Sequence, residues 1–302
     1  MRILVTGADG FVGKHLCRHL RDDGAEVFEL RGPETPGPTH VDLTDGPAVE
    51  RVVRECQPEG VVHLAGFSSV AQSHADPARA FAVNALGTVN ILAALRKSAP
   101  TARAVVVSSG EVYGRMAEGE RATEATALDP LSPYAASKAA AETASVQFFR
   151  SYGLPVVVAR PFNHLGSGQA AHFVVPSFAR QLLAIRAGTI EPRLEVGNLE
   201  PVRDFSHVKD VVEAYRLLLL RGAPGEAYNV ASGAGRTILS VLEELRTLVG
   251  VTVEPTVSPD RFRPAEIPYL VGDAAKLRAL GWHPKRTVTE ALHDVIQEVT
   301  AL

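Results

Sequence analysis

The sequence predicts an α/β fold, a doubly wound parallel sheet with a smaller carboxyl-terminal domain. The first 20 residues contain an apolar strand pattern, a glycine-rich turn and an apolar-periodic helix. Over about the first 160 residues strand-like and helix-like patterns alternate, which is typical of a parallel sheet with helices on both faces. We expect the larger domain over 1–165, with 204–232 contributing back to it, and the smaller domain over 166–203 and 233–302.

The glycine-rich turn follows the apolar run 3–6, with glycines spaced G-x-x-G-x-x-G. Glycine permits a positive φ in a tight turn and lets the backbone approach a pyrophosphate without an intervening Cβ atom. The helix that follows would offer unpaired N–H groups and its positive dipole end to the phosphates. The strand–turn–helix context therefore favours a Rossmann-type dinucleotide site over a loop that is merely rich in glycine. Its candidate residues are Gly7, Gly10, Phe11, Val12 and Gly13.

The remaining elements of the larger domain follow in order. Short apolar runs predict strands, and segments with apolar residues at helical spacing predict helices. Strands are expected at 25–30, 60–64, 104–108 and 155–159, and helices at 47–56, 76–97 and 133–152. The runs AVVVS and PVVVA are continuous enough for strands buried on both faces. The helix over 133–152 begins at a proline and is expected to end at Gly153.

Regularity decreases after Arg160. Loops are expected at 166–168 and 193–200, helices at 176–187, 210–220, 237–249 and 288–300, and a short strand at 227–230. The 210–220 segment, DVVEAYRLLLL, is strongly apolar, and the last two helices are amphipathic.

The overall composition excludes several classes of protein. A net charge of −3 argues against a nucleic-acid-binding protein, and the lack of an 18-residue apolar run predicts no membrane span. The first strand begins so early that no signal peptide is expected. Cys17 and Cys56 predict two reduced thiols in a cytoplasmic protein. No cluster of histidine, cysteine and aspartate has metal-ligand spacing, so no metal is expected.

A candidate catalytic group lies in the second half of the larger domain. Tyr134 and Lys138 are at i and i+4 on one helical face. A lysine ammonium near a tyrosine hydroxyl lowers the pKa of that hydroxyl, which could then exchange a proton with an alcohol or carbonyl oxygen. Ser109 follows a buried strand at the sheet edge where ligands bind. Taken alone, these patterns also describe a solvated pair and turn residues.

Together these motifs resemble the extended short-chain dehydrogenases/reductases of the nucleotide-sugar epimerase, dehydratase and reductase kind. The shared segments are GADGFVG, Asp42-Leu43, His63-Leu64-Ala65, Asn84 with Gly87-Thr88, SSGEVYG, YAASK and RPFN. Within this group, the segment from Arg160 to Gln169, the FVVPSFA run and Arg203-Asp204-Phe205 most resemble GDP-6-deoxy-D-mannose reductases.

The resemblance implies roles for individual residues. The catalytic set would be Ser109, Tyr134 and Lys138, with Lys138 also bonding the nicotinamide ribose. Further cofactor contacts would come from Asp42, Leu43, Leu64, Ala65, Gly66 and Asn84. Substrate contacts would come from Ser68, Glu111, Asn163, Val174, Val175, Ser177, Arg203, Arg263 and Glu266. Asn163 and Arg203 match positions that hold the diphosphate, which suits the planar fork of arginine.

Two departures from the family pattern refine the expected reaction. Sugar 4,6-dehydratases carry a polar pair where this chain has Gly110-Glu111, and glycine cannot act as an acid. Elimination needs an acid and a base, whereas ketone reduction needs a hydride and one proton donor, so a reductase is favoured. NAD enzymes usually present an acid after the second strand, where this chain has Arg31. Arginine attracts a 2′-phosphate, so NADP(H) is favoured and NAD(H) is possible, with Glu29 as the alternative ribose contact.

The resulting hypothesis is reduction of the C4 ketone of GDP-4-keto-6-deoxy-D-mannose to GDP-6-deoxy-D-mannose (GDP-D-rhamnose). The alternatives are a nucleotide-sugar 4,6-dehydratase, a 4-epimerase and a non-catalytic dinucleotide sensor. The family also suggests a homodimer, built on the helices near 81–95 and 134–149.

Overall fold

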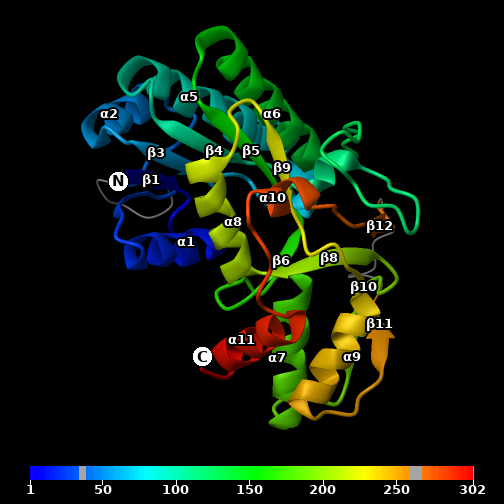
Figure 1. Ribbon diagram of the computed structural model, residues 1–302. Coiled ribbons are helices and arrows are strands. Elements are labelled where there is room, and N and C mark those ends of the chain that lie inside the picture. The colour runs from blue at the N-terminus through cyan, green and yellow to red at the C-terminus, as the bar shows by residue number, and fades with distance from the viewer. Residues whose placement is uncertain (34–38, 259–266, 302) are drawn as a thin grey trace.

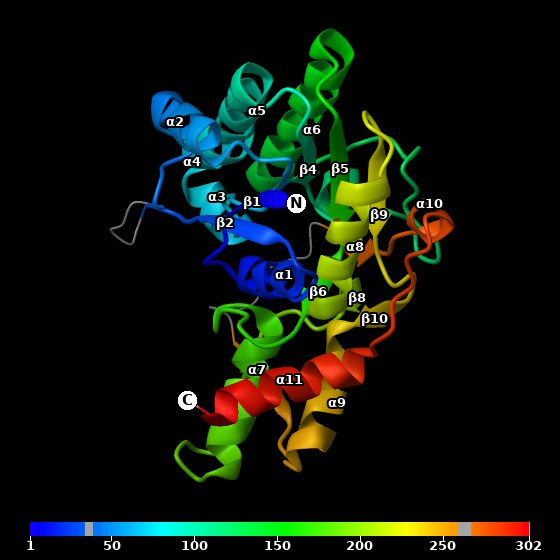
Figure 2. The same cartoon turned by 60° about the vertical axis from the view of Figure 1, so that its left-hand side comes forward.

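The computed structural model describes residues 1–33, 39–258 and 267–301. In this part of the chain, a six-stranded parallel sheet has the order β2-β1-β3-β4-β5-β9. Its strands are β1 (Arg2–Thr6), β2 (Glu26–Leu30), β3 (Gly60–His63), β4 (Arg103–Val107), β5 (Val156–Pro161) and β9 (Ala227–Val230). Helices α1 (Phe11–Asp22) and α8 (Val208–Arg221) cover one face, and α2 (Gly46–Cys56), α5 (Gly87–Ser98) and α6 (Pro133–Tyr152) cover the other (Figures 1 and 2). The predicted doubly wound parallel sheet is confirmed.

Alternate residues of each central strand supply the two cores. In β1, Ile3 and Val5 pack toward α1 and α8, whereas Leu4 packs toward α2 and α5. This alternation is why the strand is apolar throughout. Cys17 and Cys56 lie in opposite cores as free thiols. Burial raises the pKa of each thiol to about 11.

A second group of elements lies below the sheet in Figure 1 and has its own apolar core. It comprises β6 (Asn163–Leu165), α7 (Val174–Arg186), β7 (Leu194–Val196), β8 (Val202–His207), β10 (Gly235–Thr237), α9 (Ile238–Val249), β11 (Pro255–Val257), β12 (Tyr269–Leu270) and α11 (Val288–Ala301). Helix α10 (Ala275–Ala279) lies beside β9 instead, with Leu277 in the core shared by α1 and α8. Strand β8 pairs with β6 and β12 in parallel and with β10 in antiparallel fashion. The chain returns to the large sheet through α8, and β9 pairs with β5. The exact domain boundaries stay a prediction.

The structure differs from the predicted elements in several places. The single helix expected over 76–97 is divided into α4 (Pro77–Phe81), a π-helical turn η1 (Ala82–Leu86) and α5. Helix α3 (Val70–Ala75) and the 3₁₀ turn η2 (Gly110–Tyr113) were not predicted. The expected loop 193–200 contains β7, which pairs with β11. Strands of three residues show no usable sequence period, because tertiary pairing rather than local pattern forms them.

The segment Pro77–Ser98 is long and apolar enough to cross a membrane by length and composition alone. In an 18-residue apolar stretch of this segment, 44% is buried inside the molecule. Ile91, Leu92 and Leu95 of α5 are fully buried in the core against α2 and the sheet. A core helix passes the same test, so the segment is weak evidence for a membrane span.

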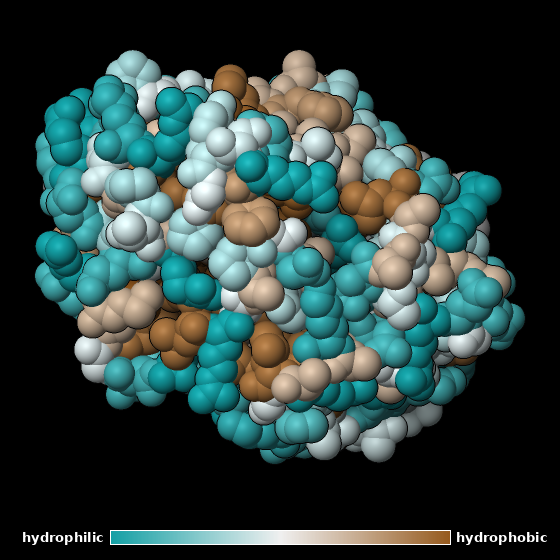
Figure 3. All heavy atoms as spheres, turned by 45° about the horizontal axis from the view of Figure 1, so that its top comes forward, coloured by the Kyte–Doolittle hydropathy of each residue, from teal (hydrophilic) through white to brown (hydrophobic). Residues whose placement is uncertain are grey.

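The surface at the end that is uppermost in Figure 1 is mostly hydrophilic, with separate hydrophobic areas (Figure 3). Among the described residues, the exposed apolar side chains include Phe81, Leu86 and Tyr152. Phe81 and Leu86 belong to the α4–η1 segment, and Tyr152 ends α6.

Candidate active site

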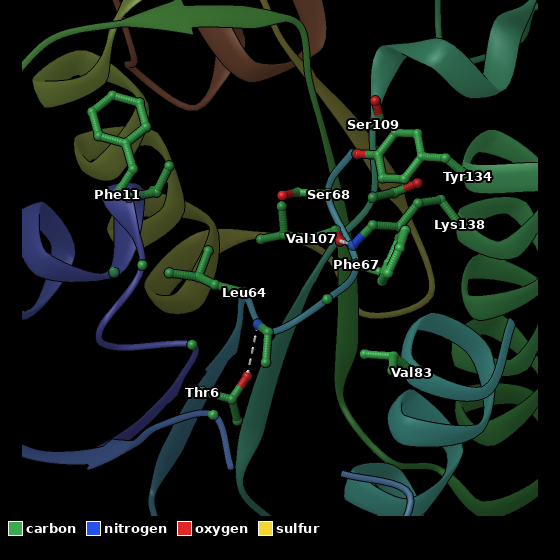
Figure 4. A pocket seen from close by; sticks show the side chains of 18 of the residues that line it. Thr6, Phe11, Leu64, Phe67, Ser68, Val83, Val107, Ser109, Tyr134 and Lys138 are labelled. Carbon is green, nitrogen blue, oxygen red and sulfur yellow. Dashed lines mark hydrogen bonds between the residues drawn. The ribbon is translucent and has the colours of Figure 1, made fainter. Parts of the chain in front are cut away.

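A cavity of about 790 Å³ opens along the carboxyl ends of β1, β3 and β4, between the sheet and the second group of elements. Figure 4 shows side chains from distant parts of the sequence facing this space. Many of the predicted site residues line it: Gly7, Gly10, Phe11, Val12, Gly13, Arg31, Asp42, Leu43, Leu64, Ala65, Gly66, Ser68, Ser109, Glu111, Tyr134, Lys138 and Asn163. The topology thus brings the glycine turn and the candidate catalytic group to one site.

The turn between β1 and α1 fits a dinucleotide pyrophosphate. Gly7 has a φ of +68°, and a Cβ atom there would lie 2.8 Å from the Ala65 amide nitrogen. A Cβ at Gly13 would collide with the Gly7 carbonyl oxygen. Gly10 precedes α1 and makes no side-chain capping bond, so the first N–H groups of the helix remain available to an anion. Glycine is needed here for close packing and for positive φ, as the sequence predicted.

Arg31 lines the end of the cavity beside β2, and Glu29 holds its guanidinium. Arg31 Nη2 lies 2.7 Å from Glu29 Oε2, and Arg21 Nη2 lies 2.6 Å from Glu29 Oε1. Burial alone would raise the pKa of Glu29, but the bonds from the two arginines bring it below its usual value. Glu29 is not among the described residues that line the cavity. This geometry leaves the cation, and not the acid, facing the cavity.

The floor of the cavity is fixed by a buried polar chain. The two ring nitrogens of His63 lie 2.7 Å from Thr6 Oγ1 and 3.1 Å from Thr88 Oγ1. Thr6 Oγ1 also accepts a bond of 3.1 Å from the Ala65 amide (Figure 4). Burial lowers the pKa of His63 to about 3, with a smaller contribution from the Lys138 charge. His63 is therefore a neutral packed residue that positions the β3 end.

Asn84 requires a correction, because its side chain is not among those lining the cavity. Its Oδ1 accepts from the Phe67 amide at 2.7 Å, and its Nδ2 donates to the Phe67 carbonyl and to Ser137 Oγ. A buried amide with these partners has little bonding capacity left. Asn84 supports the segment that carries Gly66 and Phe67 and does not contact the cofactor space directly.

Helix α6 places Tyr134 and Lys138. Its start is set by Ser132, whose side chain accepts a bond from the Ala135 amide, and its end by Gly153 in the left-handed conformation. Lys138 is buried, and its Nζ donates to the Val107 carbonyl at 2.9 Å (Figure 4). The half-buried Tyr134 has its hydroxyl bonded to Ser109. Ser109, Tyr134 and Lys138 therefore meet at one side of the cavity.

The pKa of Tyr134 differs from the sequence-based expectation that Lys138 lowers it. Burial raises the pKa of Tyr134 to about 12, against a lowering by the Ser109 bond, and the Glu111 charge raises it further. Lys138 is not among the charges acting on it, since the ammonium is directed to the Val107 carbonyl. Burial lowers the pKa of Lys138 to about 8, against the charge of Glu142. Tyr134 is thus a protonated hydroxyl near neutral pH.

The segment after β4 carries the remaining polar groups of this side. Ser109 Oγ also caps η2 by accepting from the Glu111 amide at 3.2 Å. Ser108 lines the cavity, and its buried hydroxyl has no partner in the structure. Gly110 lies against the ring of Phe162, whose Cδ1 would be 3.0 Å from a Cβ atom at that position. An unpaired buried hydroxyl at a cavity wall is suited to bonding a ligand.

The predicted substrate residues do not all reach the cavity. The predicted contact between the Val175 side chain and the substrate is wrong, because this side chain is buried in the core beneath α7. Arg203 donates to the Val202 carbonyl at 2.9 Å, and burial lowers its pKa while the charge of Glu111 raises it. Val174, Ser177 and Arg203 are not among the described lining residues, and their contacts stay predictions. Arg263 and Glu266 lie outside the described residues.

Sequence reasoning missed several residues of the cavity wall. Asp9, Arg79, Gln169 and Tyr215 line it, from the glycine turn, α4, the 166–173 segment and α8. Tyr215 belongs to α8, whose strongly apolar pattern predicts core packing, so no local pattern distinguishes it as a site residue. Gln169 Oε1 is buried without a partner, so it is suited to bonding a ligand at the cavity wall. Among the described residues, no group of three or more histidine, cysteine or carboxylate side chains could hold a metal ion.

Comparisons with known proteins agree with this geometry. Residues 4–295 match a family model described as GDP-mannose 4,6 dehydratase. A curated relative, GDP-6-deoxy-D-mannose reductase of Pseudomonas aeruginosa, is 38% identical over 98% of this chain and 96% of its own length. The solved structure of RMD from P. aeruginosa complexed with NADPH is 37% identical, has a TM-score of 0.90 and covers 99% of both chains. A Thermus thermophilus UDP-glucose 4-epimerase complexed with NAD is 36% identical, with a TM-score of 0.88 over 99% of both chains.

Proposed function

The chain belongs to the GDP-mannose 4,6 dehydratase family, and from this premise we propose that it is an NADPH-dependent nucleotide-sugar oxidoreductase. Its reaction is reduction of the C4 ketone of GDP-4-keto-6-deoxy-D-mannose to GDP-6-deoxy-D-mannose, also called GDP-D-rhamnose. The curated relative named GDP-6-deoxy-D-mannose reductase and the neighbour complexed with NADPH support this choice.

The observation that carries the proposal is the contact between Gly110 and Phe162. A dehydratase needs an acid and a base on the sugar, and Gly110 occupies one of the two positions that resemble that pair. A Cβ atom at residue 110 would lie 3.0 Å from the Phe162 ring, closer than ordinary van der Waals contact, so a side chain there would require the ring to shift. Among the described residues, Glu111 is the carboxylate that lines the cavity beside the Ser109–Tyr134 hydroxyl pair. This arrangement favours a reaction that requires one proton donor.

The side chains divide the chemistry as follows. Bound NADPH supplies the hydride. Tyr134, which its raised pKa keeps protonated, donates its proton to the C4 oxygen. Ser109 bonds the same oxygen and orients it beside Tyr134. Lys138, which lines the cavity with Nζ on the Val107 carbonyl, would bond the nicotinamide ribose.

Cofactor preference is assigned to the cavity end near β2. Arg31 would face a 2′-phosphate there, with one edge of its guanidinium held by Glu29. This favours NADPH, and NADH is the alternative cofactor because a solved structure 36% identical to this chain is complexed with NAD. The unpaired Ser108 Oγ and Gln169 Oε1 atoms and the open N-terminus of α1 fit the remainder of a dinucleotide.

Product analysis separates the reductase from its rivals. Purified protein is incubated with GDP-4-keto-6-deoxy-D-mannose and NADPH, and separately with GDP-mannose without added cofactor. The proposal predicts a reduced 6-deoxy sugar in the first reaction and unchanged GDP-mannose in the second. Formation of a ketosugar from GDP-mannose would identify a 4,6-dehydratase, and inversion at C4 without net cofactor use would identify a 4-epimerase.

We further propose a homodimer and a cytoplasmic location. In the 81–95 segment, Ile91 is buried in the core, Val83 faces the cavity and Leu86 is exposed. Leu86 and the exposed Phe81 therefore support the interface. Light scattering of the wild type and of Leu86→Glu tests it, with a monomer expected only in the variant. Reduced Cys17 and Cys56 support the cytoplasmic location, which cell fractionation checks.

A further inference from the structure

A buried ion pair lies one helical turn beyond Lys138. Glu142 follows at i+4 on α6, and Arg160 from β5 contacts its carboxylate through Nη2–Oε2 at 2.7 Å and Nε–Oε2 at 3.0 Å. The side chains of Lys138, Glu142 and Arg160 are each less than a tenth exposed. Arg160 is thus the cation that contacts this carboxylate, and Lys138 experiences the Glu142 charge without an ion pair, in an interior where an unpaired charge is strongly unfavourable.

Arg160 also contacts the segment that carries Ser109. Its Nη1 donates to the Tyr113 hydroxyl at 2.9 Å, and that hydroxyl donates to Asn229 Oδ1 at 2.6 Å. Tyr113 ends η2, the turn that begins directly after Ser109. Neither Arg160, Glu142 nor Tyr113 is among the described residues that line the cavity. One guanidinium thus joins α6 to the Ser109 segment from behind the site.

We propose that Arg160 is a positioning residue for the reaction: it holds the Glu142 carboxylate and thereby keeps the Lys138 ammonium directed into the cavity. The inference rests on the proposed function, because that function gives Lys138 its contact with the cofactor ribose. Without Arg160, Glu142 would have Lys138 as its cation at the i−4 position of the same helix, and would draw it away from the Val107 carbonyl.

The groups facing Lys138 come from three elements. Helix α6 contributes Glu142, β3 contributes the neutral His63, and β4 contributes the Val107 carbonyl. Glu142 is the carboxylate whose charge raises the pKa of Lys138 against burial. Glu142 therefore has two effects. Its charge keeps the Lys138 ammonium protonated, and when Arg160 is removed the same carboxylate competes with the Val107 carbonyl for that ammonium.

These two effects make opposite predictions for two variants. The dissociation constant for NADPH is measured by cofactor fluorescence across the pH range, without any sugar present. In Glu142→Gln the pH at which binding begins to weaken moves down by about one unit, because Lys138 loses the charge that keeps it protonated. In Arg160→Met the pH at which NADPH binding begins to weaken does not move down. The dissociation constant at neutral pH instead rises about tenfold, because Lys138 is drawn toward Glu142.

The double variant Arg160→Met/Glu142→Gln decides the matter. With no carboxylate left to capture Lys138, its affinity for NADPH at neutral pH returns to that of Glu142→Gln. If Arg160 had a purely structural role, the losses of NADPH affinity in the two single variants would add in the double variant, and no variant would change the pH at which binding weakens. Either result would overturn the proposal. If Arg160→Met does not fold, Arg160→Lys replaces it, since it keeps the charge but loses the two-pronged contact.

Arg103→Met is the matched control. Arg103 lies on β4 and donates to the backbone carbonyls of Leu219 and Gly222, away from the cavity. It is expected to lower thermal stability without changing the affinity for NADPH or its pH dependence. Because the readout is cofactor binding alone, failure of the sugar reaction would count against the proposed function and leave this inference to its own test.

Discussion

The ring of Phe162 occupies the space in which a side chain at residue 110 would have to begin, with Cδ1 at 3.0 Å and Cε1 at 3.1 Å from a Cβ atom placed on Gly110. Phe162 itself is buried and packs against Tyr113. The packing of Phe162 therefore disfavours an acidic side chain at residue 110, the position where sugar 4,6-dehydratases carry one residue of a polar pair.

Gly110→Asp tests this relationship. The carboxylate must displace the Phe162 ring, so we expect a loss of about 1–3 kcal/mol in the free energy of unfolding, typical of overpacking. Ketosugar reduction should fall and no dehydration of GDP-mannose should appear. Chemical denaturation and product analysis check both. Gly32→Ala is the control, since a Cβ there meets nothing within 4 Å, and it should leave stability nearly unchanged.

Tyr134→Phe removes the proposed proton donor and keeps the ring. We expect kcat for ketosugar reduction to fall by about two to four powers of ten, the usual contribution of a general acid. The dissociation constant for NADPH should stay within about twofold of wild type, since the hydroxyl acts on the sugar. Tyr152→Phe, an exposed tyrosine on the same helix, should behave like wild type. Near-normal turnover by Tyr134→Phe would refute the assignment.

Arg31→Ala separates the two nicotinamide cofactors. Loss of a charge-assisted contact to the 2′-phosphate should weaken NADPH binding by about 1.5–3 kcal/mol, roughly 10- to 100-fold, and leave NADH binding nearly unchanged. Arg18→Ala, an exposed position on α1, is the control. Equal losses for both cofactors would place Arg31 outside the 2′-phosphate site.

The stability of the protein should fall in mild acid because of His63. Its pKa is about 3 in the folded protein and near 6.5 when unfolded, so between these values the unfolded chain binds a proton that the folded chain does not. The free energy of unfolding should therefore decrease as pH falls, by about 2 kcal/mol between pH 7 and pH 5 from this group. Urea titrations at the two pH values measure it. His63→Asn should be less stable at pH 7 but lose about 2 kcal/mol less on acidification.

The sequence predicted the larger domain well because its strands are buried on both faces. Continuous runs such as AVVVS have few alternative environments, and α6 carries both a capping serine and a terminating glycine, so its bounds match the prediction. The second group of elements was less predictable. Strands β6, β7 and β10 have three residues each, and their pairing depends on β8 and β11, which no local period reveals.

The site was predicted in its motifs and less well in its electrostatics. The glycine turn and the Ser109–Tyr134–Lys138 group lie at one cavity, as the spacing and the family resemblance implied. Motif matching could not reveal that the Asn84 side chain bonds the Phe67 backbone, or that the Val175 side chain is buried in the core of the second group of elements. Nor could it give the pKa of Tyr134, which depends on burial and on where the Lys138 ammonium is directed.

The most direct test of the central claim is the stoichiometry of cofactor oxidation. Purified enzyme is mixed with NADPH and a limiting amount of GDP-4-keto-6-deoxy-D-mannose, and the absorbance of the reduced nicotinamide is followed beside the appearance of GDP-6-deoxy-D-mannose. NADH and the dTDP-linked ketosugar serve as parallel controls. The account predicts one NADPH oxidised for each ketosugar reduced, with the GDP-linked ketone preferred. Consumption of the ketosugar without oxidation of NADPH, or no reaction with the ketosugar at all, would contradict it.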